Sequence, residues 1–267
     1  MMDEFRGTGL RAVVTGSSGG IGGAICAALV DAGAVVVGLD TASPGGTRAR
    51  CGPAFLPLAC DLRDPDRIAA AFAEADELLE GPVTILVNCA ATFHTGHVLD
   101  MPVADVDRLL AVNVRACVVC AQEAGRRMAT AGGGRIVNVT STAADMGWRN
   151  EAVYCATKGA LAALTRGLAV DLAPYRIAVN AVSPGSIDTA GVSPELRAGE
   201  SVAHDLLRTP YGRWGRPEEI ATAVRFLAVD AGFTTGQTIT VDGGFTAAGL
   251  TFFGKTRTAE HRVQPPP

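Results

Sequence analysis

Short runs of apolar residues alternate with stretches of helical periodicity along almost the whole chain. The apolar runs are rich in Val, Ile and Leu, which is typical of strands that are buried on both faces of a sheet. They predict strands at residues 10–15, 34–40, 54–62, 83–88, 135–141, 176–182 and 238–242. Apolar residues spaced three and four apart predict helices at residues 24–32, 64–80, 102–129, 151–173 and 218–229. Strands that alternate with helices indicate an α/β fold, with a doubly wound parallel sheet and helices on both faces.

This alternation continues without a linker, a tandem repeat or a second core. We therefore expect a single domain over residues 1–267, a length that suits one large core. Residues 186–212 form an irregular or loosely helical loop region after the sixth strand. Residues 250–267 form a C-terminal tail that ends in three prolines.

A glycine-rich turn at residues 16–23 follows the first strand and leads into the first helix. Strand, glycine-rich turn and helix together are the context of a dinucleotide-binding site. The glycines let the backbone approach a pyrophosphate, whose charge then lies at the helix N-terminus. Glycines also make ordinary tight turns, and the spacing here is G-x-x-x-G-x-G rather than G-x-G-x-x-G. The prediction of a dinucleotide site therefore rests on the order of strand, turn and helix.

The second predicted strand ends in Asp40, about twenty residues beyond the glycines, where a carboxylate suits the ribose hydroxyls of the adenosine. Such a carboxylate would repel a 2′-phosphate. Neither the glycine-rich turn nor residues 41–43 contain Arg or Lys, so we predict NAD rather than NADP as the cofactor. The alternative, that Asp40 only begins a loop, stays open.

Tyr154 and Lys158 are four residues apart in a predicted helix, so their side chains share one face. A free tyrosine has a pKa of about 10 and is a poor base at neutral pH. A nearby ammonium group favours the phenolate and lowers that pKa. We therefore expect Lys158 to lower the pKa of Tyr154, which could then exchange a proton with an alcohol or an alkoxide.

The residues that carry chemistry share one position in the predicted fold, because each ends or follows a strand. They are Gly16–Gly22, Asp40, Asn88, Ser141 and Pro184-Gly185. In open α/β sheets, ligands bind beyond the carboxyl ends of the strands. The Tyr-x-x-x-Lys pattern alone could occur by chance on a helix. That the other motifs all lie at the ends of strands indicates a single site.

In order and spacing, these motifs resemble those of the short-chain dehydrogenase/reductase family. The motifs are Thr15-Gly16-x-x-x-Gly20-Ile21-Gly22, Asp61-Leu62, Asn88-Cys89-Ala90-Ala91, Asn113, Ser141, Tyr154-x-x-x-Lys158 and Pro184-Gly185. The resemblance extends from about residue 10 to residue 244. It implies a Rossmann-type fold and hydride transfer between a nicotinamide and a secondary alcohol or ketone. Ala91 departs from the glycine that is common there in the family.

The resemblance also implies roles for single residues. Tyr154 is similar to the family's acid/base, Ser141 to the hydroxyl that binds the substrate oxygen, and Lys158 to the lysine that holds the nicotinamide ribose. Asn113 is similar to the asparagine that holds a water in the proton relay. The expected cofactor-binding residues are Gly16, Ser18, Gly20, Ile21, Gly22, Asp40, Asp61, Leu62, Asn88, Ala90, Tyr154, Lys158, Pro184, Gly185, Ile187 and Thr189.

The substrate side should be formed by the loops after the fourth, fifth and sixth strands. We predict substrate contacts from His94, Trp148, Arg149 and Asn150. Polar groups favour a sugar, polyol or hydroxy acid, and Arg149 suggests an anion. Phe93 and Trp148 could instead cap a hydrophobic substrate, and polar loop residues could simply face water.

Three functions are consistent with the sequence. The first is an NAD-dependent oxidoreductase acting on a sugar, polyol or hydroxy acid, with a place in carbohydrate metabolism. The second is an NADP-dependent reductase of 3-oxoacyl thioesters or lipid-like ketones. The third is a non-catalytic dinucleotide-binding regulatory protein, against which the complete set of Asn113, Ser141, Tyr154 and Lys158 argues.

Composition narrows the partners further. The net charge is −4, and no block of Lys or Arg suggests nucleic-acid binding. No apolar run is long enough to span a bilayer, and the N-terminus lacks a signal-peptide apolar region, so we expect a cytoplasmic protein without membrane contact. By family resemblance, the helices at 102–129 and 151–173 should form a dimer interface, and strand 238–242 should complete a homotetramer.

The chain has seven cysteines, an odd number, and most lie in apolar runs. We predict free, buried thiols and no metal site. Cys117 and Cys120 form a C-x-x-C motif, but they lie inside a predicted helix and are expected to pack in the core.

Overall fold

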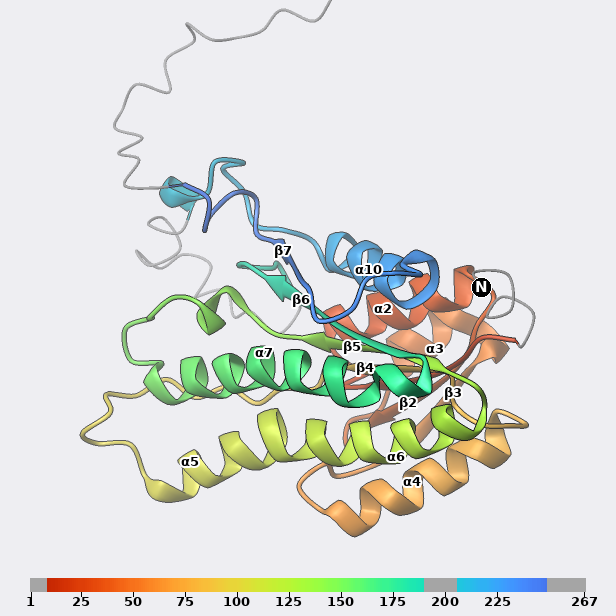
Figure 1. Ribbon diagram of the computed structural model, residues 1–267. Helices are drawn as coiled ribbons and strands as arrows, with labels where there is room; N and C mark the ends of the chain where they lie inside the picture. Colours follow the sequence, from red (N-terminus) through yellow and green to blue (C-terminus); the bar gives the residue numbers. More distant parts are fainter. Residues whose placement is uncertain (1–8, 190–205, 249–267) are drawn as a thin grey trace, which may run out of the picture.

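The computed structural model describes residues 9–189 and 206–248, and within these ranges the chain forms one seven-stranded sheet (Figure 1). Its strands are β1 (Arg11–Thr15), β2 (Val35–Asp40), β3 (Phe55–Ala59), β4 (Ile85–Asn88), β5 (Gly134–Val139), β6 (Ile177–Pro184) and β7 (Thr238–Val241). Every neighbouring pair is parallel, in the order β3-β2-β1-β4-β5-β6-β7. The predicted doubly wound sheet is therefore confirmed, although β3 ends at Ala59 rather than at residue 62.

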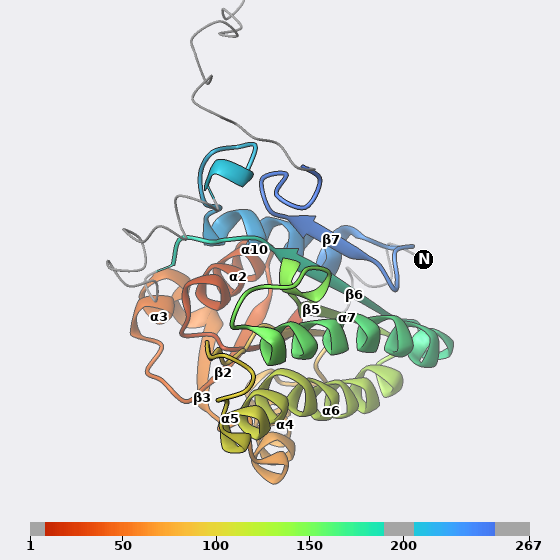
Figure 2. The same cartoon turned by 90° about the vertical axis from the view of Figure 1, so that its left-hand side faces the viewer.

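Helices cover both faces of this sheet (Figures 1 and 2). One face carries α2 (Gly20–Asp31), α3 (Gly45–Cys51) and α10 (Pro217–Arg225). The other carries α4 (Pro65–Leu78), α5 (Val103–Leu110), α6 (Ala116–Thr130) and α7 (Ala152–Leu172). Apolar side chains on alternating positions of the strands fill both layers, which explains why the strand sequences are almost uniformly apolar.

The predicted helix at 102–129 is interrupted. A π turn, Ala111–Arg115, joins α5 to α6, and a second π turn, Phe226–Asp230, follows α10. In the first, the N–H of Ala116 donates to the carbonyl of Ala111 rather than to that of Val112. Single π turns inside α-helices are frequent at functional sites.

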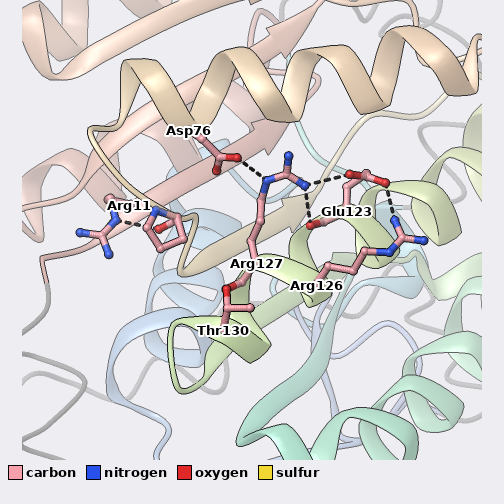
Figure 3. A network of polar contacts seen from close by, with 7 residues as sticks. Arg11, Asp76, Glu123, Arg126, Arg127 and Thr130 are labelled. Atoms are coloured by element: carbon pink, nitrogen blue, oxygen red, sulfur yellow. Dashed lines mark hydrogen bonds and ion pairs between the residues drawn. The ribbon is translucent and has the colours of Figure 1, made fainter.

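Arg127 fixes α6 against α4 (Figure 3). Its Nε lies 2.7 Å from Oδ2 of Asp76 on α4, and its Nη1 lies 2.8 Å from Oε2 of Glu123 on α6. The guanidinium also lies 5.5 Å from the centroid of the Phe72 ring. This contact sets the relative position of α4 and α6 on their face of the sheet.

The strand order reverses between β1 and β4, which are neighbours in the sheet but not in the sequence. The connections after these two strands therefore run to opposite faces and leave a crevice at the carboxyl ends. The glycine-rich turn, Asp40, Asn88, Ser141 and Pro184-Gly185 end or follow strands at that edge of the sheet. None of the helices within the described ranges is both long and apolar enough to cross a bilayer.

Candidate active site

The glycine-rich turn lies at the point where the strand order reverses. Gly16 has a φ of +71°, and its N–H donates to the carbonyl of Leu39 at 2.8 Å. A Cβ on Gly16 would lie 2.8 Å from Cα of Ala90, and one on Gly22 would lie 2.0 Å from the carbonyl oxygen of Gly16. The turn is thus closed tightly against both α2 and the loop after β4, as a cradle for a pyrophosphate requires.

Asp40 is anchored beside this turn. Its Oδ2 accepts the N–H of Ser18 at 2.9 Å, and its Oδ1 accepts the N–H of Ala42 at 3.0 Å. The Ser18 hydroxyl donates to the carbonyl of Ala42 at 3.0 Å. Within the described ranges Asp40 has no ion-pair partner, so its negative charge is fixed and uncompensated at the end of β2.

The turn after β4 is tied to β1. Oγ1 of Thr15 accepts the N–H groups of Cys89 and Ala90 at 3.0 and 3.1 Å. The Asn88 side chain points to β5, where its Nδ2 donates to Oδ1 of Asn138 at 2.9 Å. Sequence reasoning missed Asn138, which continues this buried chain to Thr165 on α7 at 2.9 Å and so fixes that helix against the sheet.

Other predicted cofactor residues follow β3 and β6 in the sequence. Thr189 returns to the glycine-rich turn, since a Cβ on Gly20 would lie 3.0 Å from its Cβ. The N–H of Gly185 donates to the carbonyl of Val241 at 3.0 Å. Ile187 packs against the core beneath α2, and Leu62 is buried in the opposite layer.

Asp61, by contrast, lies at the surface. Its carboxylate pairs with Arg63 at 2.6 Å, and hydrogen bonds from Arg63 lower the pKa of Asp61.

Ser141, Tyr154 and Lys158 come together at the end of β5. Tyr154 hydrogen-bonds Ser141, whose Oγ also accepts the N–H of Ala143 at 3.1 Å. Nζ of Lys158 donates to the carbonyl of Val139 at 2.9 Å and lies 5.7 Å from the centroid of the Tyr154 ring.

The expectation that Lys158 lowers the pKa of Tyr154 is wrong for this structure. Burial disfavours the phenolate and raises the pKa of Tyr154 to about 12, which the hydrogen bond from Ser141 offsets only in part. Burial also lowers the pKa of Lys158. The ammonium group lies over the ring and bonds the carbonyl of Val139, not the phenol oxygen, so Tyr154 keeps its proton.

Asn113 lies in the π turn between α5 and α6 and is buried. Its Oδ1 accepts the N–H of Thr92 at 2.8 Å, and its Nδ2 donates to the carbonyl of Thr92 at 2.9 Å and to Oγ1 of Thr157 at 3.2 Å. The side chain therefore joins the loop after β4 to α7. This explains a polar residue in an apolar helix; that it also holds a water stays a prediction.

The predicted substrate residues do not all face one point. His94 turns toward α5, with its Nδ1 3.8 Å from Oδ1 of Asp105. The carbonyl of Asn150 accepts the N–H of Gly96 at 2.8 Å, which joins the loops after β4 and β5. Arg149 is exposed and has no ion-pair partner among the described residues.

Two aromatic contacts involve loops at the carboxyl end of the sheet. Phe93 packs edge-on against Tyr154, with ring centroids 4.9 Å apart. Trp148 stacks on Phe245, with centroids 5.5 Å apart and planes at 11°. Sequence reasoning did not single out Phe245, because nothing in its local sequence marks it.

All seven cysteines are free, as expected. Burial raises the pKa of the thiols of Cys60 and Cys117 to about 11 and of Cys89 to about 12. These thiols stay protonated near neutral pH. No group of His, Cys, Asp and Glu suited to a metal ion occurs in the described parts of the chain.

Comparison with known proteins identifies the class. A family model described as enoyl-(acyl carrier protein) reductase matches residues 16–246. The chain belongs to the short-chain dehydrogenase/reductase family. It is accordingly an oxidoreductase of the kind that uses a nicotinamide dinucleotide and acts on alcohol or carbonyl groups.

Individual relatives are similar over nearly their whole length. L-xylulose reductase of Bos taurus is 37% identical over 247 residues, which cover 91% of this chain and 99% of the relative. The crystal structure of a putative short-chain alcohol dehydrogenase from Sinorhizobium meliloti has a TM-score of 0.87 at 36% identity and covers 90% of this chain and 98% of that one. A gluconate 5-dehydrogenase from Burkholderia cenocepacia, solved with NADP and tartrate, has a TM-score of 0.82 at 34% identity and covers 93% and 99%.

Proposed function

We propose that this protein is an NAD-dependent dehydrogenase that oxidises a secondary alcohol of a sugar, polyol or hydroxy acid. The observation that carries the proposal is the hydrogen-bonded pair of Ser141 and Tyr154, with Lys158 beneath the ring, next to the turn that Gly16 and Gly22 close. The xylulose and gluconate enzymes described above support the substrate class.

The residues present fit a dinucleotide. The close packing of Gly16 against Ala90 and of Gly22 against Gly16 fixes the shape of the turn, and the N-terminus of α2 favours the negative charge of a pyrophosphate. Asp40 would bind the adenosine ribose, and Lys158 the ribose of the nicotinamide. When bound, the cofactor supplies the acceptor for the hydride of the alcohol.

The chain's own residues handle the proton. The hydrogen bond between Ser141 and Tyr154 sets their two hydroxyls side by side, so both can contact one substrate oxygen. In the reduction direction Tyr154, which holds its proton, donates it to the developing alkoxide. In the oxidation direction Tyr154 must first lose its proton, because only the phenolate can accept the proton of the alcohol.

The first test is NAD reduction, followed by absorbance, across sugars, polyols, hydroxy acids and steroid-like alcohols. Turnover of a polar alcohol supports the proposal and identifies the substrate class. Tight NADH binding without turnover of any alcohol would instead favour a regulatory protein.

Asp40 predicts the choice of cofactor. We expect kcat/KM to be roughly 100-fold higher with NAD than with NADP, because like charges a few Å apart repel by several kcal/mol at an effective dielectric of about 20. Asp40→Ser should reduce this ratio, mostly by improving KM for NADP. The measurement is kcat/KM with each cofactor at saturating alcohol.

Asp31→Asn is the matched control, since Asp31 lies at the far end of α2 and its loss should leave the ratio unchanged. A wild-type preference for NADP would contradict the assignment of Asp40. It would favour the alternative reductase function.

We also propose that the protein is a homotetramer, or a homodimer, in solution. α7 exposes a row of small and apolar residues beside the charged Arg166. They are Ala156, Ala163, Gly167 and Val170, and Val170 is exposed to 75%. Small residues let two helices approach closely, and β7 is an edge strand with one unpaired side.

We expect light scattering at micromolar concentration to give two or four times the mass of one chain. Val170→Asp should lower that mass, because it places a charge where two apolar helix faces meet. A wild-type protein with the mass of one chain would rule out the proposed assembly.

A further inference from the structure

Three side chains from three different loops form one continuous stack. The guanidinium of Arg208 lies 4.5 Å from the centroid of the Phe245 ring, and the same ring stacks on Trp148 with centroids 5.5 Å apart. Trp148 follows β5, Arg208 lies in the segment after β6, and Phe245 follows β7. We call these three residues the cation–aromatic stack.

The base of the stack is fixed. Phe245 is only 4% exposed. The carboxylate of Asp242 accepts the N–H of Gly244 at 2.9 Å and the N–H of Thr246 at 2.8 Å, which holds the turn that carries Phe245. That turn packs on the Pro184-Gly185 end of β6, since a Cβ on Gly185 would lie 2.8 Å from Cβ of Asp242.

The segment that carries Arg208 is held to the same turn. The N–H of Tyr211 donates to the carbonyl of Gly243 at 3.2 Å, and a Cβ on Gly244 would lie 3.0 Å from Pro210. In Figure 2 the two segments, cyan and blue, lie side by side at the top of the molecule. Arg208 is therefore positioned by packing rather than by a salt bridge.

The stack belongs to the substrate side of the site. Trp148 lies between Ser141 and Tyr154 in the sequence, in the loop that delivers both reacting hydroxyls. Phe245 lies three residues beyond Asp242, which contacts the turn expected beside the nicotinamide. The loops after β5, β6 and β7 thus each contribute one member to the cation–aromatic stack.

Arg208 has no ion-pair or hydrogen-bond partner among the described residues, and neither does Arg149, the neighbour of Trp148. A guanidinium that stacks by its face keeps its N–H donors at the edge, in a planar fork that matches a carboxylate. The guanidinium group of Arg208, which stacks on Phe245 and has no such partner in the described ranges, therefore makes the cation–aromatic stack suited to a planar anion.

We infer that Arg208 binds the carboxylate of the substrate, so that the alcohol oxidised at Tyr154 is that of a hydroxy acid. Arg149, the neighbour of Trp148 in the sequence, adds a second positive charge to the loop after β5. This inference rests on the proposed function and narrows its substrate class from sugars, polyols and hydroxy acids to the last of these.

The kinetic test compares matched substrates, an aldonate and the alditol of the same carbon skeleton, such as gluconate and glucitol. We expect the wild type to have a lower KM for the aldonate. Arg208→Gln should raise the ratio of the aldonate KM to the alditol KM roughly 10- to 100-fold, the range expected for a hydrogen bond to a charged group. Arg208→Lys should lie between, because it keeps the charge and loses the fork.

Arg176→Gln is the matched control, since Arg176 is exposed before β6 at the opposite end of the sheet and should leave the ratio unchanged. An equal KM for aldonate and alditol in the wild type would overturn the inference. So would an unchanged ratio in Arg208→Gln.

A second readout does not need turnover. The chain has two tryptophans, so Trp214→Phe leaves Trp148 as the only indole. In the presence of NADH, gluconate should change the Trp148 fluorescence at concentrations where glucitol does not, and Arg208→Gln should remove that response. A response to glucitol equal to that of gluconate, or a response to a sugar phosphate but not to gluconate, would overturn the assignment of a carboxylate.

The two readouts separate this inference from the proposed function. Gluconate binding that depends on Arg208, without turnover of any alcohol, would support the anion site and contradict the dehydrogenase. Turnover of alditols with no response to gluconate would do the reverse.

Discussion

Tyr154→Phe is expected to lower kcat/KM by roughly 10³-fold, because proton transfer by a positioned side chain contributes about 10²- to 10⁴-fold to a rate. The substitution removes only the hydroxyl. The phenylalanine ring can keep the edge contact with Phe93 and the place of Lys158 over its face. The measurement is steady-state NAD reduction with whichever alcohol the substrate panel identifies.

The loss should fall on kcat rather than on cofactor binding. The affinity for NADH, followed by fluorescence, is expected to stay within about threefold of the wild type, because the glycine-rich turn and Asp40 are untouched. A tenfold loss of affinity would require the loss of about 1.4 kcal/mol of binding free energy. Tyr175→Phe is the control, since Tyr175 is exposed beyond the end of α7. Full activity of Tyr154→Phe would show that another group supplies the proton.

The elements that carry this site could be predicted because their signals are local. Tyr154 and Lys158 are four positions apart, and this spacing alone places both on one face of α7. Asp40 likewise closes an apolar run at the end of β2, so its position needs no knowledge of the rest of the fold.

Other features depend on contacts that no local pattern records. The pKa of Tyr154 is raised because the folded chain buries the hydroxyl, and burial cannot be read from the helix sequence. The stack of Arg208, Phe245 and Trp148 joins residues that are far apart in the chain. The π turn at Asn113 arises where the side chain must reach both Thr92 and Thr157, which belong to other elements.

Gly22→Ala is expected to weaken NAD binding at least tenfold and to lower the melting temperature by several degrees. The added methyl group would lie 2.0 Å from the carbonyl oxygen of Gly16 and 2.8 Å from its carbonyl carbon, both of them backbone atoms. Only a shift of the glycine-rich turn away from α2 relieves this overlap. Overpacking of this kind costs about 1–3 kcal/mol, and each kcal/mol lowers Tm by roughly 2–4 °C in a chain of this size.

Gly19→Ala tests whether this effect depends on geometry or on glycine content. Gly19 lies in the same turn, but its φ is −76° and an added Cβ would meet its nearest atom, the Gly16 carbonyl oxygen, at 3.5 Å. Because that is an ordinary van der Waals contact, thermal melting of Gly19→Ala should follow the wild type. If both variants lost the same stability, general loss of flexibility in the turn would explain the result. A loss of stability confined to Gly22→Ala would mean that the turn keeps its shape only while the backbone of Gly16 touches α2. Titration of the two variants with NADH would then show whether cofactor binding depends on that shape.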